Sequence, residues 1–215
     1  MSNKTYFITI AGNIGVGKST LTRLLAEQLD WQPFQEGFEE NPYLSDFYGN
    51  MTHWSFHSQV FFLSQRLQQH HRLLQHPTSV IQDRSVYEDA EIFARNLFNK
   101  GHMSERDWET YKSLYHTLSQ LLQPPDLVVY LKASVPTLQR RITHRGREYE
   151  QSLALDYLVQ LNQLYDNWAA GFKLCPVLTV ATDSLDYVQN DNHLRQISEA
   201  IQERLHGRDF LDLSG

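Results

Sequence analysis

The chain has 215 residues, of which 41% are hydrophobic and 20% are charged, a composition typical of a globular protein with a sizeable core. Its formal net charge is −6, which argues against nucleic acid as its main partner. Cys175 is the single cysteine, so a disulfide framework is excluded and we expect a small buried hydrophobe rather than a nucleophile. Because no signal-like segment or membrane-length apolar run is evident, the sequence predicts a cytoplasmic protein with no membrane partner.

In chain order, the pattern predicts strands and helices in alternation. Short β-branched or aromatic runs predict buried strands at residues 5–11, 78–82, 127–131 and 176–181, with a weaker strand at 33–37. Helices are predicted from residue 20 and at residues 55–75, 104–122, 136–144, 153–172 and 191–206. The alternation predicts a single α/β domain over residues 1–215, with a five-stranded parallel sheet flanked by helices.

A glycine-rich segment lies between the first predicted strand and the first helix. It consists of Gly12, Asn13, Ile14, Gly15, Val16, Gly17, Lys18 and Ser19, followed by Thr20. The segment fits the phosphate-loop pattern G-x-x-x-x-G-K-[ST] at every fixed position. Backbone N–H groups at a helix N-terminus bind phosphate, Lys18 adds charge for the β- and γ-phosphates, and Ser19 offers a hydroxyl to Mg²⁺. We therefore predict an ATP-type triphosphate site here.

Two carboxylates lie at the ends of predicted strands, Glu36 within the last residues of one and Asp83 directly after another, at the sheet edge where open α/β sheets bind ligands. Glu36 could take a proton from a substrate hydroxyl, although Glu39 and Glu40 close by also fit a solvated charged loop. Asp83 could hold Mg²⁺, and Arg84 beside it could bridge substrate and phosphate. The alternative for Asp83 and Arg84 is a simple ion pair in a loop.

Gln59 and Arg66 share one face of a predicted helix, together with Phe62. A glutamine amide can pair with the donor–acceptor edge of a nucleobase. From the helical pattern alone, however, an exposed surface position is the favoured interpretation.

Four arginines cluster at Arg140, Arg141, Arg145 and Arg147, which is unusual in an acidic protein. Guanidinium groups stabilise the charge of a transferred phosphoryl group. The cluster predicts an arginine-rich lid at about residues 141–152, with a solvated basic face as the alternative.

The chain has ten histidines, including the adjacent His70 and His71. They lack the spacing of a zinc site, so we expect surface residues and no zinc.

Several of these segments together resemble the deoxyribonucleoside kinases, and within them the bacterial deoxyadenosine/deoxycytidine kinases. The likeness runs from about residue 5 to residue 180. The segments that carry it are Asn41-Pro42-Tyr43-Leu44, Trp54-Ser55-Phe56-His57-Ser58-Gln59, Gln82-Asp83-Arg84-Ser85-Val86-Tyr87-Glu88-Asp89, Arg145-Gly146-Arg147 with Glu150, and Asn167-Trp168 through Cys175-Pro176-Val177-Leu178.

The resemblance implies a P-loop kinase fold and ATP-dependent phosphorylation of the 5′-hydroxyl of a deoxyribonucleoside for nucleotide salvage, with Mg²⁺ as cofactor. Deoxyadenosine is the first candidate and deoxycytidine the second. A deoxyguanosine kinase is the alternative, and a nucleoside-monophosphate kinase would need further basic groups. A GTPase-type switch would carry Asn-Lys-x-Asp, which the sequence lacks. Two long helices with apolar stripes predict a homodimer.

The resemblance also implies roles for individual residues. Glu36 would activate the 5′-hydroxyl, with Asp83 as the competing base, although Gly37-Phe38 departs from the family's usual Pro-Val after that carboxylate. Tyr48 and Glu150 would hold the sugar 3′-hydroxyl. The nucleoside site as a whole would comprise Glu36, Tyr48, Gln59, Phe62, Arg66, Arg84, Asp89, Phe93 and Glu150. Arg141, Arg145 and Arg147 would be the lid arginines on ATP, and Ser19 with Asp83 would hold the metal.

Overall fold

The computed structural model describes residues 4–35, 41–147 and 154–206. Its strands form one parallel sheet in the order β2-β3-β1-β4-β5. The strands are β1 (Phe7–Gly12), β2 (Gln32–Phe34), β3 (Val80–Asp83), β4 (Leu127–Lys132) and β5 (Val177–Ala181). The predicted sheet is therefore confirmed, with shifts of one or two residues at most strand ends; the weak strand predicted at 33–37 is shorter, and its last two residues lie outside the described residues.

Helices connect and cover the strands. They are α1 (Lys18–Leu29), α2 (Leu44–Gly49), α3 (Met51–Leu74), α4 (Val86–Glu88), the π-helix η2 (Asp89–Ala94), α5 (Arg95–Asn99), α6 (Glu105–Ser119), α7 (Val135–Arg145), α8 (Leu155–Gly171) and α9 (Asp191–His206). The sequence did not predict α2 or the segment from α4 to α5. Helix α3 begins four residues before its predicted start, because the Asn50 side chain accepts a hydrogen bond from the His53 backbone N–H and caps it.

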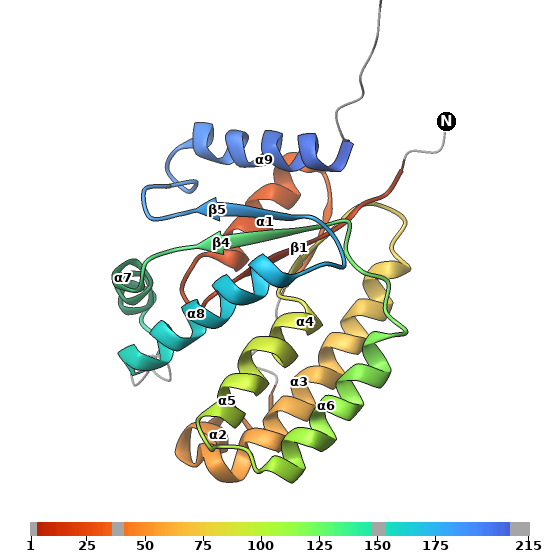
Figure 1. The fold of residues 1–215 in the computed structure, drawn as a ribbon. Coiled ribbons are helices and arrows are strands. Elements are labelled where there is room, and N and C mark those ends of the chain that lie inside the picture. The colour runs from red at the N-terminus through yellow and green to blue at the C-terminus, as the bar shows by residue number, and fades with distance from the viewer. Residues whose placement is uncertain (1–3, 36–40, 148–153, 207–215) are drawn as a thin grey trace, which may run out of the picture.

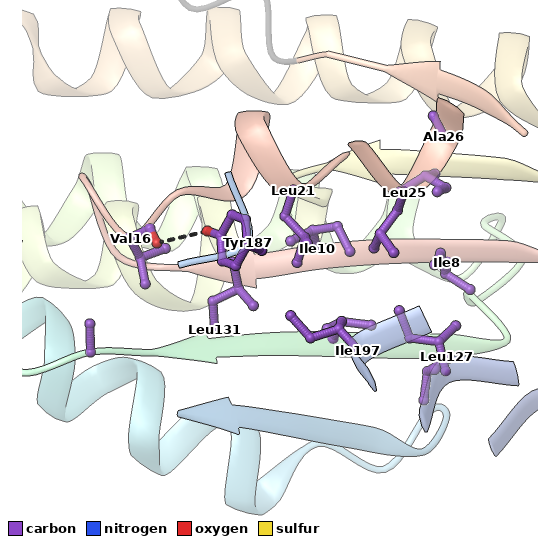
Figure 2. Close-up of a cluster of buried hydrophobic side chains, with 14 of the residues drawn as sticks. Ile8, Ile10, Val16, Leu21, Leu25, Ala26, Leu127, Leu131, Tyr187 and Ile197 are labelled. Atoms are coloured by element: carbon purple, nitrogen blue, oxygen red, sulfur yellow. Dashed lines mark hydrogen bonds between the residues drawn. The ribbon is translucent and has the colours of Figure 1, made fainter. Parts of the chain in front are cut away.

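Alternating side chains of the central strands pack into separate cores on the two faces of the sheet. Ile8 and Ile10 of β1 face α1 and α9 and contact a core that includes Leu21 and Ile197 (Figure 2). Tyr130 of β4 belongs to the core on the opposite face, under α4, α6 and α8. Burial on both faces explains why these strands are continuous apolar runs in the sequence.

Away from the sheet, α3 and α6 lie side by side and extend to the end of the molecule occupied by α2 and α5 (Figure 1). Helix α7 lies near the carboxyl ends of β4 and β5 (Figure 1). No helix within the described ranges is long and apolar enough to cross a membrane.

The prediction that the histidines lie at the surface is wrong for His70. Its side chain is 3% exposed, because α3 packs against the sheet there and sets the ring edge-on to Phe7 with centroids 5.5 Å apart. Burial lowers the pKa of His70 to about 4, and a hydrogen bond to the Gln123 backbone partly offsets this effect. Cys175 is half-buried, and burial raises the pKa of its thiol to about 11, as expected for an unreactive cysteine.

Candidate active site

A pocket opens at the carboxyl ends of β1 and β3, between the phosphate loop and helices α2, α3 and η2. It encloses about 970 Å³ of empty space, including the part that is open to solvent. Predicted nucleotide-site residues that line it are Ile14, Gly15, Gly17, Lys18, Ser19, Thr20, Arg145 and Arg147. Predicted nucleoside-site residues that line it are Tyr48, Gln59, Phe62, Arg84, Asp89 and Phe93. The structure thus brings members of both predicted groups to one cavity. The predicted site residues in the described ranges that do not line it are Gly12, Asn13, Val16, Arg66, Asp83 and Arg141. Glu36 and Glu150 lie outside the described residues.

The phosphate loop adopts a backbone that favours glycine at positions 15 and 17. Gly15 and Gly17 have φ of +80° and +106°, in the region that L-residues rarely adopt. A Cβ atom would lie 2.6 Å from Ile142 Cγ1 if placed on Gly15, and 2.1 Å from Tyr187 Oη if placed on Gly17. The loop is therefore packed against α7 and against the segment that follows β5.

Lys18 and Ser19 begin α1 at the floor of the pocket. Lys18 Nζ donates to the carbonyls of Gly12 at 2.9 Å and Asn13 at 3.1 Å, which holds the ammonium group over the loop. Ser19 Oγ donates to Asp83 Oδ2 at 2.5 Å. The two predicted metal-binding side chains are therefore neighbours, and both offer the oxygen ligands that Mg²⁺ prefers.

Arg84 occupies a strained turn directly after β3. Its φ is +65°, its backbone N–H donates to the carbonyl of Ile10 at 3.1 Å, and its guanidinium lies 4.2 Å from the ring centroid of Phe93. A left-handed backbone in a non-glycine residue costs about 1–2 kcal/mol and is characteristic of functional sites. The turn directs a positive charge into the pocket next to the phosphate loop.

Gln59, Arg66 and Asp89 form a buried polar group at the base-site end of the cavity. Gln59 and Arg66 are each 4% exposed, so the exposed position favoured by the helical pattern is wrong. Arg66 Nε donates to Asp89 Oδ2 at 2.8 Å, joining α3 to η2. Within the part of the chain that the structure describes, Gln59 Oε1 is buried and has no hydrogen-bond partner. A buried acceptor in this position is suited to a ligand donor.

The arginine cluster divides into two roles. Arg145 ends α7 and, with Arg147, lines the pocket. Arg141 instead donates to the Val16 carbonyl at 2.9 Å and to the Thr182 carbonyl at 2.7 Å, and it is not among the pocket-lining residues. Arg141 therefore braces the phosphate loop from outside, whereas the other two can meet a nucleotide.

Sequence reasoning missed several residues that complete the site. Leu44, Phe47 and Tyr157 line the cavity, and burial raises the pKa of Tyr157 to about 12. Glu88 is fully buried beneath the phosphate loop, and Tyr187 covers the loop from the segment after β5 (Figure 2). A signal for Glu88 was available, since Ser85-Val86-Tyr87-Glu88 matches the capping-box pattern S-x-x-E that α4 uses.

The chain matches known proteins along nearly its whole length. A family model described as deoxynucleoside kinase matches residues 8–206. Over 205 residues the chain is 37% identical to the deoxyadenosine/deoxycytidine kinase of Bacillus subtilis (strain 168), covering 94% of each chain. It is 35% identical to the deoxyguanosine kinase of the same organism, covering 94% of this chain and 98% of the relative. A solved structure of deoxyadenosine kinase from M. mycoides with the products dCMP and a flexible dCDP has a TM-score of 0.82 at 28% identity, covering 92% of this chain and 99% of that chain.

Proposed function

Because the chain belongs to the deoxynucleoside kinase family and transfers a phosphoryl group to a deoxynucleoside, we propose that deoxyadenosine is its preferred acceptor, with deoxycytidine second and ATP as the donor. The expected family resemblance is confirmed by the comparisons. The acceptor preference rests on the site itself.

The buried amide of Gln59 is the observation that carries the proposed preference. Adenine and cytosine both present an exocyclic amino donor, which the buried Oε1 can accept. The amide nitrogen can donate to the neighbouring ring nitrogen, so one side chain addresses two adjacent base atoms. Phe62 and Phe93 line the same cavity and offer aromatic surface to a base.

Deoxyguanosine is the competing acceptor. Its base carries a carbonyl where adenine carries an amino group, so the Gln59 amide would have to turn to pair with it. The similarity to a deoxyguanosine kinase keeps this alternative in the test.

We propose Glu36 as the base that takes the proton of the 5′-hydroxyl. It is two residues beyond the end of β2, whose carboxyl end lies at the same sheet edge as the phosphate loop. Asp83 is the competing base, but its side chain already accepts the Ser19 hydroxyl, which supports a role beside the metal. Mg²⁺ would be held by the side chains of Ser19 and Asp83 and would neutralise phosphate charge.

Positive side chains would stabilise the transferred phosphoryl group. Lys18, Arg84, Arg145 and Arg147 all line the pocket, from the phosphate loop, the turn after β3 and the end of α7. Charge that spreads over the phosphoryl oxygens in the transition state would thus meet preorganised cations.

We also propose a homodimer and a cytoplasmic location. Leu74 at the end of α3 and Leu114 of α6 are apolar side chains that are 40% and 39% exposed on the paired helices, and their burial against a second copy would favour self-association. Light scattering at micromolar concentration should give twice the mass of one chain, and the mass of a single chain would contradict the dimer.

The acceptor proposal is tested by ADP release from ATP and Mg²⁺ with each of the four deoxynucleosides in turn. Deoxyadenosine should give the highest kcat/KM and deoxycytidine the second highest. Lys18→Ala is the matched control and should nearly abolish the nucleoside-dependent signal, because the ammonium group that meets the β- and γ-phosphates is lost. A highest kcat/KM with deoxyguanosine would replace the proposed acceptor, and absence of nucleoside-stimulated release would refute the proposed reaction.

A further inference from the structure

We propose that Glu88 is a positioning residue that joins the phosphate loop to the Arg84–Ser85 turn, so that the phosphate donor and the acceptor hydroxyl are held in register. The inference rests on the phosphoryl transfer described above. It concerns a side chain that does not line the pocket and that no substrate atom is expected to touch.

Both carboxylate oxygens of Glu88 are engaged by groups from different elements. Oε1 accepts from the Gly12 backbone N–H at 3.3 Å and from the Tyr165 hydroxyl at 2.9 Å. Oε2 accepts from the Ser85 backbone N–H at 2.9 Å and from its Oγ at 3.3 Å. The residue is 0% exposed, so water does not replace any of these donors. One buried carboxylate therefore links β1, the turn after β3, and α8.

The two linked loops are those that carry the chemistry. Gly12 opens the phosphate loop, and its carbonyl accepts from Lys18 Nζ while its N–H is bound by Glu88. Ser85 directly follows Arg84, whose backbone is strained. Strands β1 and β3 are paired with Ile10 opposite Asp83, so these loops leave the sheet side by side. Glu88 fixes their spacing just beyond the last strand pair.

The location is costly for a carboxylate, which argues for a specific role. Burial raises the pKa of Glu88, while Arg84, Lys18 and the hydrogen bonds from Ser85 and Tyr165 lower it. An anion beneath a phosphate site also repels the triphosphate. If charge alone mattered, removing it should therefore tighten ATP binding, whereas loss of positioning should slow the reaction. The two accounts predict opposite results.

Glu88→Gln separates them because it keeps the shape of the side chain. A glutamine amide has one acceptor oxygen, so its nitrogen would face a donor N–H from either Gly12 or Ser85. We expect kcat to fall by about 100-fold, the scale of a misplacement of about 1 Å. Deoxyadenosine affinity, measured by calorimetry, should stay within about threefold, because the base site is untouched.

Tyr165→Phe is the matched control. It removes one donor to the same carboxylate but leaves the contacts to Gly12 and Ser85 in place. This variant should lower the urea midpoint and keep kcat within about threefold. Turnover of deoxynucleosides by the wild type and by this control also tests the proposed function independently of Glu88.

The proposal would be overturned if the Glu88→Gln variant were less stable than the wild type but had a kcat within about twofold of it. Tighter ATP binding with unchanged kcat would also overturn it, in favour of the charge account. If Glu88→Gln does not fold, Glu88→Asp keeps the charge but is one methylene shorter and can reach only one loop. Glu88→Asp should then show the same loss of kcat. If it has a normal kcat, or if neither variant folds, Glu88 contributes to stability only and the proposal is overturned.

Discussion

Replacing Gly17 with alanine tests how tightly the phosphate loop is packed from outside. The residue has φ of +106°, where an L-residue pays about 1–2 kcal/mol. The new Cβ would also lie 2.1 Å from Tyr187 Oη and 3.3 Å from its Cζ, and such overpacking costs about 1–3 kcal/mol. Together these terms predict that Gly17→Ala lowers the free energy of unfolding by about 2–5 kcal/mol.

A double-mutant cycle with Tyr187→Phe separates the two terms. Tyr187→Phe alone removes a hydroxyl that donates to the Gly17 carbonyl at 3.2 Å, a loss of about 1 kcal/mol. In the double variant the hydroxyl that clashes at 2.1 Å is absent, so the backbone cost of alanine and the milder 3.3 Å contact with Cζ remain. Urea unfolding of the four proteins should therefore give a favourable coupling of about 1–3 kcal/mol. Additive changes would refute the packing account and would leave backbone strain as the whole effect.

Three further changes test the site and the core. Glu36→Gln should cut kcat by about 10²–10⁴-fold with little change in nucleoside affinity. The rate of this variant and of Asp83→Asn is measured against pH. If only Asp83→Asn loses proton abstraction, Asp83 rather than Glu36 is the base. Gln59→Ala should raise KM for deoxyadenosine and flatten the preference among bases by about 1–3 kcal/mol, whereas parallel kcat/KM profiles across the four deoxynucleosides would contradict a base-reading role. Because burial lowers the pKa of His70 from 6.5 to about 4, the unfolded chain binds the extra proton first; stability from this residue is intact above pH 6.5 and falls by up to about 3 kcal/mol as pH drops to 4. His70→Leu should remove that part of the slope in urea midpoints, and an unchanged slope would show that other groups cause it.

The sheet and the phosphate loop could be predicted from local sequence because their constraints are local. Strands buried on both faces must be mostly apolar, as in β1 and β4. The loop glycines, Lys18 and Ser19 are required by backbone geometry and by phosphate chemistry, so their spacing carries the prediction.

The elements around the nucleoside pocket could not be predicted in the same way. Helix α2 has six residues, and η2 is a π-helix whose wider turn has no simple periodicity in the sequence. Burial of Gln59 and His70 depends on what α3 packs against, which the helix sequence alone does not contain. The helical pattern around Gln59 predicted an exposed position, and only the family resemblance predicted that its side chain contacts the nucleobase.

Arg141 showed a different limit of motif reasoning. Its predicted contact with ATP stays a prediction, and the motif did not reveal that its guanidinium donates to the carbonyls of Val16 and Thr182. Long-range partners decide such a role, since Thr182 is 41 residues away along the chain.

The bracing of the phosphate loop by Arg141, Thr182 and Tyr187 has a consequence for synthesis on the ribosome. Arg141 lies 125 residues beyond its loop partner Val16, and Tyr187 lies 170 residues beyond its loop partner Gly17, so these supports are synthesised well after the loop. Chains grow from the N-terminus at about 5–20 residues per second, so the loop exists for several seconds before its outer contacts can form. The phosphate loop is thus made well before the residues that support it from outside.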